Sequence, residues 1–596
     1  EFRVTYQRIR DFRTTDTRFP QVTVRLPDGG RFVAGTEQFS TANELDQDIF
    51  ELTNDLTMVR STHTITLGTH NEFFNFRNLF IRDNFGTYEF ASLDTFEAGS
   101  AQLYDYSFST TGDPKFAAEF PSYQIGFYAG DQWRLRQNFT LTYGIRWDKP
   151  FFPDKPTANP QSVATYGYAT DVVPETSSWS PRVGFNWDLT KDMTRQQIRG
   201  GFGLFSGRTP YVWLSNQYGN TGIEFRRLQV SPFAATNNIP FVPDPDNQPT
   251  SVGRASTNEI DVMDPAYDFP MITRGNLAYD RSLPWGLTGT VELLFANDVK
   301  DIAYSNLNLV PTATREDGRP VFGRVNSTFG DVILLENSTE GNSWSIATKV
   351  DKQFRGGWFA SASYLYGQAN SINDGTNSQA RSTWINVYTA GDINNPPLAV
   401  SNYDVGHRIV LTGSYLFSIK DVGVTLSMFY NGQTGRPYSY NFGTDVNLDG
   451  ASTNDLLFYP RDGDVTFTTG SYQELAAFLE AGNCTDVVPG AIVARNSCRM
   501  PWTNGLDFHS AINAGIGRFK PEFTFDIVNL INLFDSSKGQ VDYAAFHDLL
   551  VVNATPSATG EYSYSVNSIA RPGGVRYTRD DLRSRWQAQI GLRLRF

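Results

Sequence analysis

The sequence has few cysteines, few histidines, few charged residues and no long apolar run. Among 596 residues there are two cysteines and five histidines, and charged residues make up only 19% of the chain. No stretch approaches the roughly 18 consecutive apolar residues that a transmembrane helix needs. The histidines, His63, His70, His407, His509 and His547, are scattered. Because no HExxH spacing or Cys/His cluster accompanies them, a zinc enzyme is not indicated.

The sequence also lacks an excess of positive charge and a secretory signal. A formal net charge of -13 argues against nucleic acid as a partner, because phosphates attract basic surfaces. The first residues, EFRVTYQRIRDF, contain no apolar core and no small-residue cleavage site. We therefore expect the chain to be a mature or truncated form.

Aromatic residues and glycines are abundant, which favours strands and turns. The chain has 45 Phe, 28 Tyr and 50 Gly, and aromatic residues reach 14%. The mean hydropathy of -0.36 is typical of soluble proteins. A membrane-spanning strand, however, needs only about 9 to 11 residues with every second one apolar, so a barrel keeps a low mean hydropathy. The composition favours an all-β fold.

Strict alternation of apolar and polar residues recurs along the chain. It is clearest at the end, where Trp586, Ala588, Ile590, Leu592, Leu594 and Phe596 interleave with polar residues or glycine. Alternation of this kind predicts strands with one apolar face. The same pattern occurs at 139–147, 287–295, 343–354, 409–417 and 422–430. Aromatic residues at both ends of such strands, as at Phe139 and Trp147, are typical of the girdles of an outer-membrane barrel.

The predicted strands are joined alternately by tight links and by long connections. The long ones include Asp148 to Ser180 and Gln229 to Phe269, which are rich in Pro, Asn, Asp and Ser. Short periplasmic turns and long extracellular loops are expected for an outer-membrane barrel. Alternation predicts roughly 18 to 20 strands. A soluble sandwich or propeller also contains many alternating strands, so periodicity alone leaves that alternative open.

The segment GFYAGDQWRLRQNFTLTYGIRWD resembles a barrel hairpin of TonB-dependent outer-membrane transporters, and later segments resemble the Oar-like group of that family. SPRVGFNWDL followed by IRGGFGLFSGRTP is similar to the next strand pair. The other resembling segments, in chain order, are 276–308, 401–417, 436–460, 523–535 and 586–596. The resemblance extends from roughly Asn43 to Phe596, and no single motif decides it.

The resemblance implies a large antiparallel transmembrane β-barrel of about 22 strands with long extracellular loops. Residues 1–596 would form this barrel domain, incomplete at the N-terminus. It also implies a plug in the lumen, a periplasmic TonB-box peptide and often an amino-terminal carboxypeptidase-regulatory-like domain, none of which is in this sequence. The expected location is the bacterial outer membrane.

The resemblance implies ligand uptake through a plug-gated barrel, energised by the TonB complex through the missing N-terminal segment. The expected partners are outer-membrane lipid, the TonB energising complex, and an unknown ligand or surface protein. An alternative is a barrel for protein export or surface-partner scaffolding. We do not expect an enzyme, because the sequence shows no nucleophile with a base, no paired catalytic carboxylates and no cofactor loop.

One loop has the spacing of an EF-hand-type calcium site. In DVNLDGASTND, side-chain oxygens of Asp445, Asn447 and Asp449 would bind calcium together with the carbonyl of Ala451. Thr453 or Asp455 would supply the remainder, while the usual Glu at position twelve is replaced by Leu456. The alternative is a loop whose side chains only make local hydrogen bonds.

The two cysteines, Cys484 and Cys498, predict a single disulfide, with two unpaired thiols as the alternative. A short helix is predicted just before them at 472–483, because Leu475, Phe478 and Leu479 share a face.

Two further groups of residues have structural interpretations. Arg146, Arg593 and Arg595 are expected to line the lumen wall, where they are solvated or contact a plug. The GGFGLF run at 200–205 lacks a following Lys-Ser/Thr, so it is read as strand and not as a phosphate loop.

A membrane location predicts that the protein partitions into the outer membrane and needs detergent to stay soluble, since the apolar strand faces require lipid or detergent contact. Fractionation of cells followed by extraction with and without detergent tests this expectation. Recovery of a stable soluble monomer in plain buffer would contradict it.

Overall fold

A computed structural model describes residues 1–27, 30–192, 194–230, 239–252, 259–353, 356–375, 377–514, 520–556 and 561–595. Parts of the predicted 229–269 connection, the side chain of Arg595 and all of Phe596 lie outside the described residues. No helix in the described ranges is long and apolar enough to cross a membrane.

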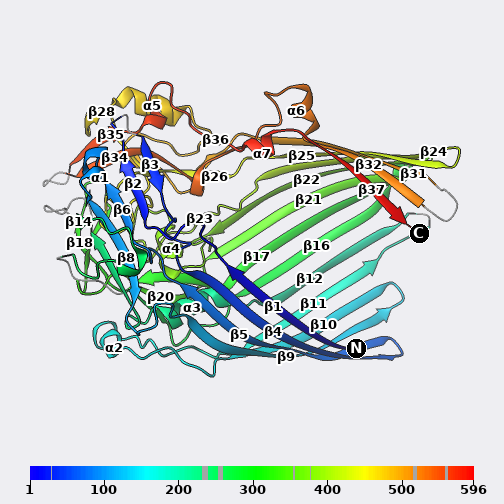
Figure 1. Cartoon of the computed structure of the whole chain (residues 1–596). Helices are drawn as coiled ribbons and strands as arrows, with labels where there is room; N and C mark the ends of the chain where they lie inside the picture. Colours follow the sequence, from blue (N-terminus) through cyan, green and yellow to red (C-terminus); the bar gives the residue numbers. More distant parts are fainter. Residues whose placement is uncertain are drawn as a thin grey trace.

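The fold is a large antiparallel β-barrel whose sheet contains 19 strands in the described residues (Figure 1). Three of these strands, β15 (Ile260–Met263), β20 (Val332–Ser338) and β23 (Ala399–Val400), belong to the mouth, so 16 form the wall. The sheet total of 19 agrees with the 18 to 20 strands expected from alternation, whereas the wall has fewer than the 22 implied by the resemblance. The wall strands, each paired antiparallel with the next, are β1 (Phe2–Phe12), β4 (Asn43–Arg60), β5 (His63–Phe80), β9 (Ala118–Arg136), β10 (Phe139–Phe151), β11 (Ser178–Asp188), β12 (Gln196–Ser206), β16 (Met271–Leu283), β17 (Leu287–Asn306), β21 (Gly341–Gln353), β22 (Trp358–Ser371), β24 (His407–Ile419), β25 (Val422–Gln433), β31 (Thr503–Ala514), β32 (Lys520–Val528) and β37 (Gln587–Arg595).

Tight and long connections alternate along the wall, as predicted. Short links join pairs such as β4–β5 and β24–β25, and every long connection lies at the opposite end (Figure 1). Both chain termini lie at the short-link end. In outer-membrane barrels this end faces the periplasm and the long loops face the outside.

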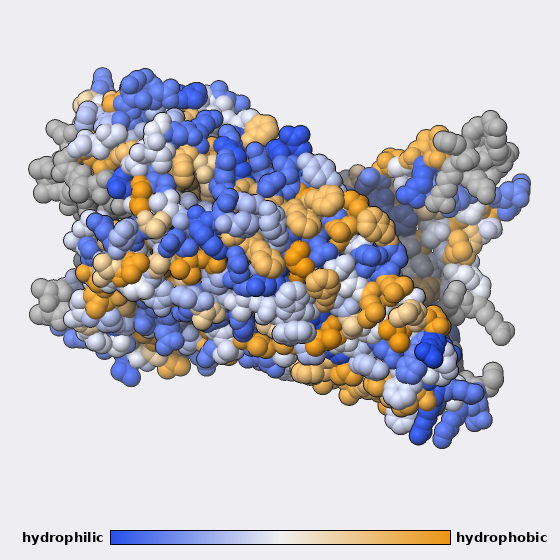
Figure 2. Space-filling model, turned by 90° about the horizontal axis from the view of Figure 1, so that it is seen from below, coloured by the Kyte–Doolittle hydropathy of each residue, from blue (hydrophilic) through white to orange (hydrophobic). Residues whose placement is uncertain are grey.

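One face of the wall carries large apolar side chains that are exposed to the surroundings. Cross-strand register places Met428 opposite Phe508, and Ile590 opposite Phe525, on this face. Met428 is 45% exposed and Ile590 is 81% exposed, which is the outward apolar band expected for lipid contact. Figure 2 shows hydrophobic residues in patches along the strand region. The pattern favours a membrane barrel over a soluble sandwich, in which both sheets would bury these side chains.

The long loops fold into three compact layers. The first is a five-stranded sheet of β13 (Phe225–Val230), β8 (Leu103–Ser109), β6 (Thr87–Phe90), β2 (Gln21–Arg25) and β3 (Arg31–Ala34), with α1 (Leu93–Glu97), β7 (Ser100–Ala101), β14 (Ile239–Pro240) and η1 (Pro245–Asn247) beside it in the sequence. Buried residues including Val24, Tyr88, Phe90 and Tyr104 form its core.

The second layer lies at the mouth of the barrel. It contains α2 (Pro160–Tyr166), α3 (Tyr211–Gly219), α4 (Ala380–Ile385), β15 (Ile260–Met263), β18 (Leu309–Thr314), β19 (Pro320–Arg324), β20 (Val332–Ser338) and β23 (Ala399–Val400). Phe74 and Phe120 extend from the inward face of β5 and β9 into this layer, where Phe120 stacks on Tyr218 of α3 at 4.0 Å between ring centroids. The loops therefore turn inward and pack against the wall.

The third layer is a separate loop subdomain with its own apolar core. Its sheet consists of β28 (Thr466–Thr469), β35 (Tyr562–Val566), β34 (Asp548–Pro556), β26 (Pro437–Phe442) and β30 (Cys498–Arg499). Around it lie α5 (Tyr472–Glu480), β27 (Phe458–Tyr459), β29 (Ala491–Ile492), η3 (Ala545–His547) and η4 (Ser568–Ala570), while α6 (Leu530–Phe534), β33 (Asp542–Tyr543), β36 (Thr578–Arg579) and α7 (Asp581–Ser584) complete the last connection. The remaining short helix, η2 (Pro284–Gly286), forms the β16–β17 link.

The predicted helix at 472–483 is confirmed as α5, which begins at Tyr472 and ends at Glu480. Ser471 caps it by accepting a hydrogen bond from the backbone N–H of Glu474, and Leu475 and Leu479 are buried. The GGFGLF run lies within strand β12, as expected.

The alternation predicts opposite tolerance of charge on neighbouring residues of β25. We expect Met428→Arg to reduce the stability of the folded barrel in lipid by about 2 to 4 kcal/mol, because the side chain must enter hydrocarbon. Ser427 lies on the other face, opposite His509, so Ser427→Arg should be tolerated. Urea titration of the protein folded in lipid vesicles measures both. Equal losses for the two variants would contradict the assignment of the faces.

Candidate functional site

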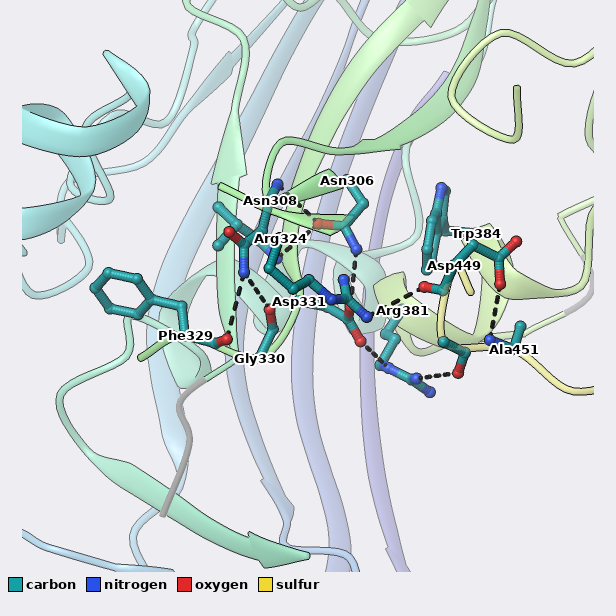
Figure 3. A network of polar contacts seen from close by, with 12 residues as sticks. Asn306, Asn308, Arg324, Phe329, Gly330, Asp331, Arg381, Trp384, Asp449 and Ala451 are labelled. Atoms are coloured by element: carbon teal, nitrogen blue, oxygen red, sulfur yellow. Dashed lines mark hydrogen bonds and ion pairs between the residues drawn. The ribbon is translucent and has the colours of Figure 1, made fainter. Parts of the chain in front are cut away.

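A buried polar network joins five separate segments in the mouth layer (Figure 3). Its centre is Asp331, which is 7% exposed. One carboxylate oxygen accepts hydrogen bonds from Arg324 Nη1 and Asn306 Nδ2, both at 2.8 Å. The other accepts from Arg381 Nε. Burial acts to raise the pKa of Asp331, but Arg381 and Arg324 outweigh it and hold the pKa below its usual value.

The two arginines extend the network to the loop 445–455. Arg324 Nη2 donates to the carbonyl of Asp449 at 3.1 Å, and Arg381 Nη2 donates to the carbonyl of Gly450 at 3.2 Å. Asn308 continues the network on the other side by donating to the carbonyl of Gly330 at 2.7 Å. Asp331 therefore connects the end of strand β17, strand β19 and helix α4, and through its two arginines it is linked to the loop 445–455.

A pocket of about 170 Å³ lies beside this network. Four arginines line it, namely Arg82, Arg226, Arg227 and Arg381, together with the acids Glu259 and Asp331. Burial, followed by the charge of Arg82, lowers the pKa of Arg227. Guanidinium groups gathered around one cavity favour a ligand with carboxylate, phosphate or other acceptor oxygens.

Asp261 lies next to the pocket and has a different environment from Asp331. It is fully buried, one carboxylate oxygen accepts from Asn220 Nδ2 at 2.7 Å, and the other has no partner in the described residues. Burial, and then the charge of Glu259, raise the pKa of Asp261 well above its usual value. Burial therefore favours the protonated form of Asp261 more than that of Asp331.

Below the mouth the barrel contains a larger cavity of about 750 Å³. Most of its lining comes from the inward face of strands β11 to β22, where Arg182, Arg274 and Asn276 alternate with outward apolar residues. Leu294 and Leu365 add apolar area. The cavity and the pocket thus belong to the same inward-facing side of the wall.

The calcium loop predicted from the sequence is folded as a series of tight turns. Asp445 accepts from the N–H of Gly450, Asn447 from that of Asp449, and Asp449 from that of Ala451, at 2.8 to 2.9 Å. The carbonyl of Thr453 accepts from Asn441 Nδ2 at 2.7 Å.

The carboxylate of Asp455 is fully used within the protein. Arg319 Nη1 donates to one oxygen at 2.6 Å and the N–H of Val446 to the other at 2.9 Å. Burial raises the pKa of Asp455 to about 7 and that of Asp445 to about 6. In the described residues no group of three or more His, Cys, Asp or Glu side chains is arranged to hold a metal ion.

The structure also places the other residues singled out in the sequence. Cys484 and Cys498 are joined by a disulfide, which links the end of the α5 segment to β30. Arg146 donates to Asp148 on the inward face of β10, and Arg593 pairs with Glu522 at 3.1 Å. His407 contacts Tyr364, and the histidines do not gather in one site.

The mouth residues were missed by sequence reasoning because no local motif marks them. Arg324 and Asp331 come from the connection between β17 and β21 and Arg381 from the connection between β22 and β24, and none of the three stands in a recognisable motif. The adjacent pair Arg226 and Arg227 is the one local signal, since two charged neighbours in an otherwise apolar strand are unusual.

Residues 6–548 match the family model of outer-membrane beta-barrel domains. No curated protein matches the chain. Among solved structures, the outer membrane transporter YddB from Escherichia coli is similar in fold, with a TM-score of 0.52 and 13% identity over 99% of this chain and 60% of that chain.

Two further solved structures are similar at a lower level. The ferric enterobactin receptor PfeA from Pseudomonas aeruginosa has a TM-score of 0.43 and 11% identity, covering 100% of this chain and 58% of that chain. The siderophore receptor PirA from Acinetobacter baumannii has a TM-score of 0.42 and 10% identity, covering 89% and 55%. The chain therefore spans less than two thirds of the length of these proteins.

The environments of the two buried acids predict opposite responses to amide substitution. Asp331→Asn removes the charge that pairs with two arginines, and we expect it to destabilise the mouth layer by about 3 kcal/mol. Asp261→Asn removes no ion pair and replaces an acid whose protonated form is favoured by burial with a group of the same shape, so the change should stay below about 1 kcal/mol. Hydrogen exchange of mouth-layer amides in detergent measures both. A larger loss for Asp261→Asn than for Asp331→Asn would contradict the assigned charges.

Proposed function

The chain belongs to the outer-membrane beta-barrel domain family, and from this membership and the loop architecture we propose that it is the barrel of an outer-membrane transporter. In this proposal the long loops capture a ligand at the mouth and the barrel passes it inward. The wall and the loops are the parts of such a transporter that these residues supply.

The observation that carries the proposal is the presence of two cavities, one among the loops at the mouth and one against the inward face of the wall. The outer one, of about 170 Å³, is lined by Arg82, Arg227 and Arg381, and the inner one, of about 750 Å³, lies against the strands. Convergent polar groups in a mostly preformed cavity are the usual features of a ligand site. The loop-built pocket is the point of capture, and the lumen is the onward path.

Gating and energy supply form a further part of the proposal. A plug in the lumen and a periplasmic segment that contacts the TonB complex, both implied by the resemblance, would block and open the path. The polar inward face of the wall, with pairs such as Arg199 and Asp280 at 3.0 Å, offers hydrogen-bonding partners for a plug surface.

A second candidate function is protein export or the holding of surface partners. The observation that favours it is the loop subdomain with its own five-stranded sheet, apolar core and the Cys484–Cys498 disulfide. A subdomain of this kind exceeds what a small pocket needs, and it presents a rigid surface on the outer side.

Transport predicts energy-dependent removal of a compound from the medium. Bacteria producing the full-length protein should deplete at least one component of spent growth medium, and a proton uncoupler should stop the depletion. Arg82→Gln and Arg227→Gln together should lower the uptake rate at limiting concentration by about tenfold or more, because each arginine offers charge-assisted hydrogen bonds. Mass spectrometry of the medium measures the change.

Arg25→Gln is the matched control, because Arg25 lies in the loop sheet but is exposed and pairs only at the surface with Glu89. It should transport normally at equal surface expression. If no compound is depleted in an uncoupler-sensitive way, and deletion of the protein instead removes proteins from the cell surface, the second function replaces the first.

A further inference from the structure

The loop 445–455 contains buried oxygen atoms that lack hydrogen-bond donors. Asn454 is 1% exposed, and its Nδ2 donates to the Asp449 carboxylate at 2.8 Å, but its Oδ1 has no partner in the described residues. Asp445 Oδ1 is also buried without a partner. So is Oδ1 of Asn441, whose Nδ2 holds the carbonyl of Thr453. All three orphan atoms are acceptors.

A buried acceptor without a donor is costly, and this loop together with its neighbour Asn441 has three such atoms. Leaving one buried oxygen unsatisfied costs about 1 to 3 kcal/mol. The turn hydrogen bonds within the loop explain the local fold but do not satisfy these three atoms. Oxygen atoms without donors are the ligands that a hard cation prefers.

The charge of the loop leads to the same conclusion. Asp455 is neutralised by Arg319. In the parts of the chain that the structure describes, neither Asp445 nor Asp449 has a lysine, arginine or histidine within ion-pair distance. The charge of Asp449 raises the pKa of Arg381, but the two do not form an ion pair. A divalent ion bound between Asp445 and Asp449 would supply the direct charge partner that these buried carboxylates lack.

We propose that this loop binds a calcium ion through Asp445 and Asp449, with Asn454 and backbone carbonyls completing an oxygen cage. This ligand set keeps two of the acids expected from the sequence and replaces Asp455 by Asn454. Asp455 is paired with the charged Arg319, whereas the Asp449 carboxylate accepts from neutral donors, the side-chain amides of Asn447 and Asn454 and the N–H of Ala451. Two carboxylates with several neutral oxygens suit calcium better than magnesium, which demands a stricter octahedral geometry and retains its water. The site is separate from the transport pocket and does not depend on the proposed function.

The bound ion would act on the mouth through the loop backbone. The carbonyls of Asp449 and Gly450 hold Arg324 and Arg381, and these arginines bind Asp331 beside the pocket (Figure 3). Fixing the loop fixes the two carbonyls. Calcium therefore orders the arginines that line and support the pocket.

Calcium binding to the purified protein in detergent tests the proposal. Protein stripped with EGTA should take up about one calcium ion per chain in an isothermal titration. Magnesium at the same concentration as calcium should not compete for the site. Asp445→Asn and Asp449→Asn should each weaken the affinity by about tenfold or more, because each removes one charged ligand.

Asp535→Asn is the matched control. Asp535 makes the same kind of turn, accepting from the N–H and hydroxyl of Ser537, but its side chain is exposed and neither of its oxygens is a buried atom without a partner. It should bind calcium like the wild type. The proposal is overturned if the stripped wild type takes up no calcium at millimolar concentration, or if the Asp445 and Asp449 variants bind as the wild type does. The first outcome needs no variant, so misfolding of a variant does not protect the proposal.

Trypsin provides a readout of the connection to the mouth. With calcium, cleavage after Arg324 and Arg381 should be slow, and EGTA should accelerate it by about tenfold or more, because the carbonyls that hold both side chains lose their fixed positions. Cleavage after Arg25 should be unchanged. Stoichiometric calcium binding with no change at Arg324 and Arg381 would overturn the coupling between the ion and the mouth.

Discussion

The constraint on which the structure depends is that lipid offers no hydrogen-bonding partner to a peptide group. Each wall strand must therefore pair with a neighbour on both sides through the membrane. Because side chains alternate between the two faces of a strand, the same pairing that satisfies the backbone sorts the chain into a lipid side and a lumen side. Met428 and Ser427 are adjacent in sequence, yet they meet different solvents. In the described residues β1 pairs with β4 and β37 pairs with β32, so these two strands are the ends of the paired series and each has one partner.

Beyond the membrane the same strands serve a second purpose. The inward face of β5 and β9, which is lumen wall lower down, carries Phe74 and Phe120 at the loop end, and these side chains bury themselves against α3. The long loops thus have an apolar surface to fold on, and they turn inward to cover it. The pocket built by the loops gains rigidity from this arrangement, because its residues lie on a packed core that is continuous with the barrel.

Charged side chains are distributed unevenly between the outward face of the wall and the mouth layer. On the outward face the exposed side chains along the strands are largely apolar, while the mouth gathers arginines and acids in a layer that excludes much of the water. Two arginines contact Asp331 and lower its pKa, whereas Asp261 accepts from an asparagine and burial raises its pKa. The loop 445–455 contacts this charged layer through Arg324 and Arg381, which donate to its backbone carbonyls. An ion at Asp445 and Asp449 would thus affect a pocket to which neither residue belongs.

The sequence by itself determined the features that arise from local periodicity and local chemistry. Alternation at 422–430 and 587–595 identified strands and their outward faces, the tight and long links identified the two ends, and α5 followed from Leu475 and Leu479 sharing a face. These features need only neighbours within a few residues, which a sequence displays directly. Only the tertiary structure decided which distant residues meet. Asp331 is hydrogen-bonded to Arg381, 50 positions further along the chain. Arg319 is hydrogen-bonded to Asp455, 136 positions further along, and this contact removes Asp455 from the calcium ligands expected from the sequence. No local pattern encodes such a meeting, because it depends on how the loops pack on the barrel rim.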